Sequence, residues 1–277
     1  LKGDEHGQWG VKHKFKAGDT DYGLYTGRYH DKAAIPVLDF SVPGRFGAGD
    51  YRLVYAKDIT FYGASFSTVW GQTNVAGEIS TRRNTPLAPV GDLIVNTAAT
   101  WDNDRNTPYA LGNTLHANLS AISVYPATSL WDGASLVAEL AFNRLLSVTR
   151  NPVNALGTSA LNTTHTRDST VMRFVFQPEY FQVMQGVDLQ LPIGVGYGIS
   201  GRSAVLQLVP EHGGDISIGV NADYRKTWKA GLNYTHYYGP QGPAPSLPAL
   251  GPTGTYASYK QYYADRDFIS LTVQRTF

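Results

Sequence analysis

Residues 265–277, at the end of the chain, constrain the fold more than any other stretch. From Ile269 onward the side chains alternate between apolar and polar, with Ile269, Leu271 and Val273 interleaved by Ser270 and Thr272. A period of two is typical of a β-strand with one apolar and one polar face. Strands of this kind close many transmembrane β-barrels and also end soluble β-sandwiches. This stretch alone therefore leaves both folds open.

The composition favours a membrane-facing β protein. Charged residues make up only 16% of the 277 residues, against roughly 25% in a typical soluble domain. A lipid-facing surface cannot carry charge, whereas a soluble surface needs it. The 18 Tyr, 11 Phe, 5 Trp and 29 Gly favour strands, turns and interfacial belts. The net charge of +1 gives no reason to expect a nucleic-acid partner.

Two further features narrow the class of protein. The chain has no Cys, which excludes disulfides, thiolate metal sites and a cysteine nucleophile. No run approaches the roughly 18 apolar residues of a membrane helix, so a membrane span would have to be a barrel. No signal peptide is visible at Leu1. We therefore expect Leu1 to be a mature terminus or a cut.

The apolar periodicity predicts an all-β fold with about eleven strands. The clearest hairpin is 215–238, which turns at Arg225-Lys226. Two assignments stay open: 134–149 also fits a helix of period 3.6, and a tight turn at Lys57-Asp58 would split 51–70 and give twelve strands. The expected strands are 8–17, 21–30, 51–70, 73–82, 116–125, 134–149, 170–180, 187–199, 215–224, 228–238 and 269–277.

The predicted connections alternate between short and long. Transmembrane barrels have short periplasmic turns and long extracellular loops, whereas a sandwich has no reason to segregate loop length by end. We therefore expect 1–277 to be a single transmembrane antiparallel β-barrel domain in a bacterial outer membrane. An aromatic girdle is expected at the short-turn end, from Trp70, Trp131, Trp228 and Phe277. The long loops are expected at 31–50, 83–115, 150–167, 200–214 and 239–264.

Strand parity leads to a further expectation. The C-terminus of such a barrel is periplasmic, so counting back through eleven strands leaves Leu1 outside the cell. Single-chain bacterial barrels have an even number of strands and both ends in the periplasm. We therefore expect an N-terminal portion with an odd number of strands to be missing, and this chain to be part of a larger barrel. With twelve strands the barrel would close alone.

Several segments resemble the proteobacterial outer-membrane β-barrel proteins of domain-of-unknown-function family thirteen-oh-two, over what would be their C-terminal half to two-thirds. The resemblance implies a longer barrel that handles hydrophobic or lipid-like compounds with periplasmic partners, and it implies no known catalytic residues. The segments that carry it are Gly7-Gln8-Trp9-Gly10-Val11, Gly23-Leu24-Tyr25, Tyr29-His30, Leu53-Val54-Tyr55-Ala56-Lys57-Asp58-Ile59, Tyr62-Gly63-Ala64-Ser65-Phe66, Val75-Ala76-Gly77-Glu78-Ile79 and Asp265-Arg266-Asp267-Phe268.

Charged residues on the polar strand faces are the candidate pore lining. Mixed charge inside a barrel can select solutes, although any water-filled lumen is polar and its charges can simply pair. The least ordinary feature is the stripe Lys12, Lys14 and Lys16, which predicts an anion-attracting wall. The full set is Lys12, Lys14, Lys16, Glu78, Arg82, Glu139, Arg173, Asp188 and Asp223.

Other motifs carry little chemistry. Gly196, Gly198 and Gly201 match GxGxxG, but no helix pattern follows, so we interpret these glycines as structural. The seven His have no metal-ligand spacing, and no Gly-x-Ser-x-Gly motif occurs. A hydrolase would need His165 or His212, both in predicted loops, as a base near Asp168 or Asp215. We expect no catalytic residues, no metal and no cofactor.

The sequence therefore predicts an outer-membrane channel or transporter, porin-like and with a mixed-charge lumen, for hydrophobic or lipid-like compounds. The alternative is a non-conducting barrel that docks a periplasmic or surface partner, and a minor alternative is an outer-membrane hydrolase. The expected partners are outer-membrane lipid, the barrel assembly machinery through the C-terminal strand, and a periplasmic lipid carrier.

Overall fold

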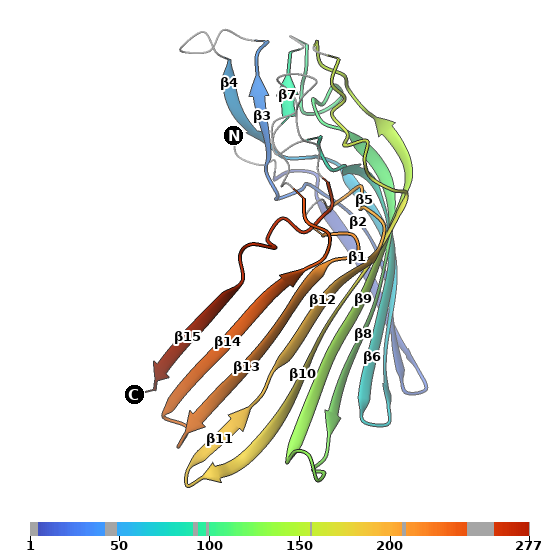
Figure 1. Ribbon diagram of the computed structural model, residues 1–277. Coiled ribbons are helices and arrows are strands. Elements are labelled where there is room, and N and C mark those ends of the chain that lie inside the picture. The colour runs from blue at the N-terminus through green and yellow to red at the C-terminus, as the bar shows by residue number, and fades with distance from the viewer. Residues whose placement is uncertain are drawn as a thin grey trace.

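A computed structural model describes residues 5–41, 49–90, 94–97, 100–155, 157–206, 209–242 and 258–276. In this part of the chain all regular secondary structure is β, and no helix is present that could cross a membrane. Most strands join one large antiparallel sheet, which curves strongly (Figure 1). Phe277 and most of the Pro-rich loop at 239–264 lie outside the described residues.

The large sheet is an up-and-down meander in which neighbouring strands follow one another along the chain, apart from β3, β4 and β7, which form a separate small sheet. Its order is β1-β2-β5-β6-β8-β9-β10-β11-β13-β14-β15, and β12 continues β11 between the same two neighbours. The strands are β1 Trp9–Ala17, β2 Thr20–Tyr29, β5 Ile59–Trp70, β6 Thr73–Pro86, β8 Leu111–Tyr125, β9 Gly133–Arg150, β10 Asp168–Met184, β11 Val187–Gln190, β12 Ile193–Ser200, β13 Gly214–Tyr224, β14 Trp228–Tyr238 and β15 Phe268–Arg275.

The sheet has eleven strand positions, which confirms that count. Because every pairing is antiparallel and the number is odd, β1 and β15 run in the same direction. Residues 134–149 form a strand within β9, so the helical alternative is wrong. The local leucine spacing had suggested that helix, but pairing with β8 and β10 along the whole length of β9 holds it extended.

Residues 51–70 are not one element, and Lys57-Asp58 is not a hairpin turn between sheet strands. β4, Asp50–Val54, pairs with β3, Ile35–Asp39, in a separate small sheet, whereas β5 pairs with β2 and β6. Asp58 has a φ of 60°, which lets the chain change direction between the two sheets. A twelfth strand made by a hairpin turn at Lys57-Asp58 is therefore wrong, although the sheet has twelve strands when β11 and β12 are counted separately.

Between the described strands, the short and long connections lie at opposite ends of the large sheet (Figure 1). The long connections carry their own structure, which the sequence did not predict. In them the small sheet β4-β3-β7 forms, where β7 is Ile94–Asn96 and runs parallel to β3. We call the small sheet and the described parts of 87–110, 151–167 and 200–213 the cap.

A hydrophobic core holds the cap together and joins it to the loop end of the large sheet. It includes Val37 and Val54 from the small sheet, Tyr109 and Leu161 from the loops, and Leu145 from β9. The loops are also linked by backbone hydrogen bonds: the amide of Ala88 donates to Ala204 at 2.7 Å, and that of Val90 to Ala160 at 3.0 Å. The long loops at this end are therefore packed against one another rather than separate.

Buried polar groups fix the cap geometry. Asp39 is fully buried and accepts hydrogen bonds from Asn96 Nδ2 at 2.9 Å, Trp101 Nε1 at 2.8 Å and the Ser41 amide at 3.0 Å. Burial alone would raise the pKa of Asp39, but the hydrogen bonds from Ser41, Asn96 and Trp101 outweigh it and hold the pKa below its ordinary value. Asp39 is therefore an ionised anchor that ties β3 to the loop carrying Trp101.

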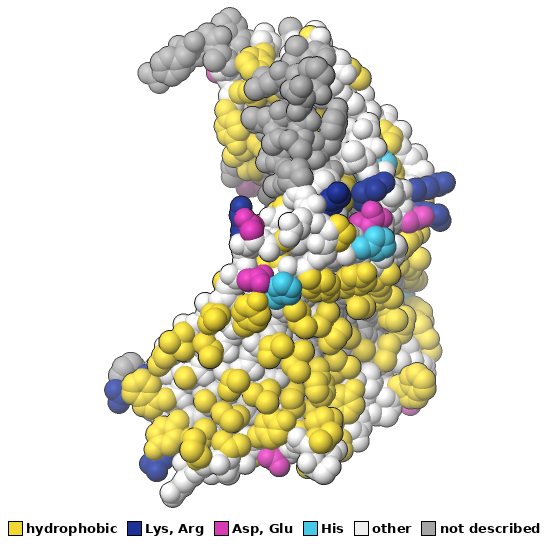
Figure 2. Space-filling model, viewed as in Figure 1, with side chains coloured by type: hydrophobic (Ala, Val, Ile, Leu, Met, Phe, Trp, Pro, Cys, Tyr) yellow, Lys and Arg dark blue, Asp and Glu magenta, His cyan; other side chains and the backbone are white. Residues whose placement is uncertain are grey.

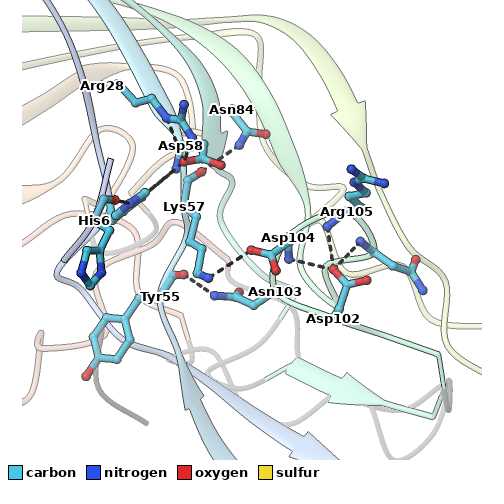
Figure 3. A network of polar contacts seen from close by, with 12 residues as sticks. His6, Arg28, Tyr55, Lys57, Asp58, Asn84, Asp102, Asn103, Asp104 and Arg105 are labelled. Carbon is cyan, nitrogen blue, oxygen red and sulfur yellow. Dashed lines mark hydrogen bonds and ion pairs between the residues drawn. The ribbon is translucent and has the colours of Figure 1, made fainter. Parts of the chain in front are cut away.

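A polar network joins the cap to the rim of the large sheet (Figure 3). Arg28 at the end of β2 pairs with Asp58, while Lys57 Nζ lies 3.0 Å from Asp104. Asn103 donates to the carbonyl of Tyr55 at 2.7 Å. Because these contacts join the linker between β4 and β5 to both β2 and the 102–105 turn, they set the position of the cap on the sheet.

The two faces of the large sheet differ in chemistry. On the outer face, register places apolar side chains side by side, as in the row Val220, Leu232 and Leu271 across β13, β14 and β15. The most exposed of them is Leu271, at 73%. Hydrophobic side chains cover this face across the strands, with charged side chains above and at the turn tips (Figure 2). The opposite face, which we call the inner wall, carries the polar set.

Gly198 offers a test of how the cap loop sits on the inner wall. A Cβ at Gly198 would collide with the carbonyl of Pro210 in the loop after β12, whereas a Cβ at Gly133 would have its nearest neighbour at 3.9 Å. We expect Gly198→Ala to lower the free energy of unfolding by about 1–3 kcal/mol and Gly133→Ala to leave it nearly unchanged. Urea unfolding in detergent measures both, and equal effects would contradict this packing.

Candidate functional site: the inner wall

The inner wall begins at the lysine stripe on the edge strand β1. Lys12, Lys14 and Lys16 alternate with outer-face residues and lie opposite Tyr25, Gly23 and Asp21 of β2. Lys12 Nζ lies 5.3 Å from the centre of the Tyr25 ring, a cation–π contact. Among the described residues none of the three lysines makes an ion pair. The stripe therefore concentrates positive charge at this edge of the sheet.

Next to the stripe lies an open trough of about 1030 Å³ that spans six strands, β1 to β9 in sheet order. Such a width is possible only on the concave side, which identifies the inner wall as that side. Small residues create the space: Gly23 and Ser65 face each other across β2 and β5, and Ser65 faces Glu78. Of the predicted pore-lining residues, the trough brings together Lys14, Lys16, Glu78 and Arg82.

The central part of the wall is electrostatically paired. Glu139 lies opposite Arg173 and accepts a hydrogen bond from Asn118. The guanidinium of Arg173 turns to Asp215, with two hydrogen bonds of 3.2 and 3.1 Å. The sequence interpretation began a strand at Asp215 but considered its carboxylate only as a neighbour of a catalytic base. Asp215 lies on the inner wall in β13, where alternation extended back by one residue along the predicted strand would have placed it.

Asp188 and Asp223 form a third group, near the other end of the sheet. Both carboxylates face Lys226 Nζ, at 2.9 and 3.7 Å. Lys226 and Arg225 have φ of 57° and 52°, as in the type I′ turns that suit two-residue hairpin loops. A cavity of about 340 Å³ adjoins this group and includes Asn233 and Thr272. Here, as in the centre, acids and bases neutralise one another.

The predicted girdle residues lie at the turn end, as far as the structure describes them. Trp70 ends β5 and is 82% exposed, and Trp228 begins β14 with the Arg275 guanidinium 5.2 Å from its ring. Trp131 lies between β8 and β9 and packs edge-on against Phe176 at 5.5 Å. Phe277, the fourth member, lies outside the described residues.

The GxGxxG match is structural in this fold. Gly198 and Gly201 lie at the end of β12, where Cβ atoms would collide with the carbonyls of Pro210 and Asp168. Gly201 also has a φ of 81°, which favours glycine. The motif therefore serves close backbone approach, as the sequence predicted.

The hydrolase alternative finds no matching geometry in the described residues. Asp168 pairs with Arg144 at 2.7 Å, and His165 Nδ1 contacts the carbonyl of Thr166 at 3.0 Å. A His–carboxylate contact that the sequence did not suggest joins His236 Nδ1 to Asp267 at 2.6 Å, where Asp267 also accepts from Tyr234. The described residues hold no cluster of three His, Asp or Glu suited to a metal.

Comparison with known proteins gives the family. A family model described as "Protein of unknown function (DUF1302)" matches residues 2–277. The chain belongs to this family. No curated protein and no solved structure gives a significant match. The family resemblance expected from the sequence is thereby confirmed.

The contact at Asp267 predicts a pH response. Hydrogen bonds from His236, the Tyr237 amide and Tyr234 lower the pKa of Asp267 to about 2. Because the folded pKa of Asp267 lies below the unfolded value of about 3.9, the ionised carboxylate stabilises the folded state above about pH 4. This contribution is lost as pH falls from about 4 through 2. We expect the Asp267 carboxyl resonance, followed by NMR, to titrate near 2, and its pKa to rise toward the ordinary value in His236→Ala/Tyr234→Phe, where the Tyr237 amide still lowers it. Titration near 4 in the unaltered protein would contradict the contact.

Proposed function

We propose that this chain is an outer-membrane β-barrel protein, or most of one, that acts as a channel or transporter for hydrophobic or lipid-like compounds. The observation that carries the proposal is the division of one continuous antiparallel sheet into an apolar outer face and a charged concave face. A sheet embedded in lipid must present apolar side chains outward while its strands satisfy each other's backbone groups. The 62–73% exposure of Ile269, Leu271 and Val273 would be costly in water and is favourable in lipid.

In this proposal the solute passes along the inner wall. The trough beside the lysine stripe supplies the path, and the arginine, lysine and carboxylate side chains along it supply the field that selects the solute. Trp70, Trp131 and Trp228 mark the periplasmic interface, where their rings bridge lipid and water. Periplasmic lipid carriers would meet the barrel at these short turns, and the barrel assembly machinery would engage β15.

The cap favours the second candidate, a barrel that docks a surface partner without conducting. Its core of residues such as Val37, Tyr109 and Leu161 covers the loop end with packed structure. If the cap closes the loop end, the barrel does not conduct. If a path remains open beside the cap, the barrel forms a pore. Conductance of the purified protein in a planar bilayer separates the two.

For the channel we predict a charge-dependent selectivity. Replacing Lys12, Lys14 and Lys16 by Glu changes the stripe by six charges, so the reversal potential in a salt gradient should shift toward cation preference. The double variant Lys32→Glu/Lys260→Glu, at two exposed loop lysines, serves as the control and should shift it little. A stable pore whose ion selectivity is unchanged by the three lysine substitutions would refute the role of the stripe. A protein that forms no pore would refute conduction.

A further inference from the structure

The inner wall carries an apolar row where a polar one is expected. Ile122 of β8 lies directly opposite Val137 of β9 and, on its other side, opposite Asn74, which in turn faces Val69 of β5. These residues alternate in phase with Ser67, Ser120 and Glu139, so they belong to the inner wall. Val69 is 63%, Ile122 52% and Val137 50% exposed.

The apolar row lies one step nearer the turn end than the row that starts at Lys16. That neighbouring row runs Lys16, Asp21, Ser67, Ala76, Ser120 and Glu139 across the same strands. Lipid cannot stabilise the apolar row, because it faces the trough side rather than the outer face. Exposed apolar patches of this kind commonly mark binding sites.

The charged side chains around the apolar row differ in whether they have a hydrogen-bond or ion-pair partner. Glu139 is hydrogen-bonded by Asn118, and Arg173 is paired with Asp215. Lys14 faces only Gly23 across the strand pair, and Lys16 lies opposite Asp21 without an ion pair between them. The acids that share the trough with these lysines are Asp21 and Glu78. A bound anion would neutralise the charges of Lys14 and Lys16.

We propose that the inner wall binds an amphipathic anion, a long-chain carboxylate, with its head on Lys14 and Lys16 and its chain along Val69, Ile122 and Val137. From Lys16 to Ile122 the sheet crosses four strand spacings, about 19 Å at about 4.8 Å each. A long acyl chain matches this length. Each methylene removed from water contributes about 0.8 kcal/mol, and the lysines confer the preference for a charged head.

This proposal rests on the proposed function in taking the inner wall as the path of the solute, and it names the class of that solute. It is tested by equilibrium dialysis of labelled hexadecanoate against the full chain in amphipol, with empty amphipol subtracted. Hexadecanol, which has the same chain and no charge, is measured in parallel. The variants are Lys14→Gln/Lys16→Gln, Ile122→Ser/Val137→Ser and the control Lys32→Gln.

We expect the lysine variant to weaken hexadecanoate binding at least tenfold and to leave hexadecanol binding unchanged. The Ile122→Ser/Val137→Ser variant should weaken binding of both ligands, and the control should weaken neither. The gel mobility shift on heating verifies that each variant is folded, and Lys14→Met/Lys16→Met takes the place of the Gln variant if that variant does not fold. Lack of hexadecanoate binding, or binding to the lysine variant as tight as to the unaltered protein, would overturn the site.

The outcome is independent of conduction. A silent barrel with lysine-dependent hexadecanoate binding would refute the channel and keep the site. A conducting pore without that binding would keep the channel and refute the site.

Discussion

The cross-strand register of the large sheet decides what every side chain in it faces. Because strand side chains alternate with a period of two, a slip of one residue would exchange the outer and inner faces along a whole strand. Antiparallel pairing extends from β1 to β15, and the register shifts only within the pairs β6–β8, β8–β9, β10–β11 and β10–β12. It aligns Val220, Leu232 and Leu271 on one side while it aligns Lys14, Gly23, Ser65 and Glu78 on the other. The charged wall, the trough and the apolar outer face all follow from that alignment.

Charge is distributed unevenly along the inner wall. In the centre Arg173 meets Asp215, and toward β15 Lys226 meets Asp188 and Asp223. At the β1 edge the three lysines form no ion pair within the described residues, although Lys16 lies opposite Asp21 and the trough also holds Glu78. Exposed ion pairs such as those in the centre and toward β15 contribute little to stability. Lysines without an ion pair on the same wall as exposed apolar residues are instead available for a ligand, which is why the two proposals converge on the inner wall.

Much of the large sheet could be predicted from the sequence, because its strands are local and their apolar spacing is regular. The hairpin at 215–238 and the final strand show this best, since each pairs with its neighbour in the chain. The cap could not be predicted in the same way. β3 and β7 pair in parallel although they are far apart in the sequence. Asp39 is buried and accepts hydrogen bonds from Asn96 and Trp101. Such contacts leave no periodicity, so 31–50 and 83–115 read as plain loops. The Val69, Ile122 and Val137 row was missed because it exists only after three strands are aligned.

The division of the sheet into a lipid face and a water face is the central claim, and β14 tests it most directly because it is paired on both sides. The chain has no Cys, so single cysteines can be introduced in turn at residues 229–234 and spin-labelled in lipid vesicles. We predict that labels at Ala230, Leu232 and Tyr234 are accessible to oxygen and shielded from a water-soluble nickel chelate, and that labels at Lys229, Gly231 and Asn233 show the reverse. Uniform access of the chelate to all six positions would contradict a membrane-embedded sheet.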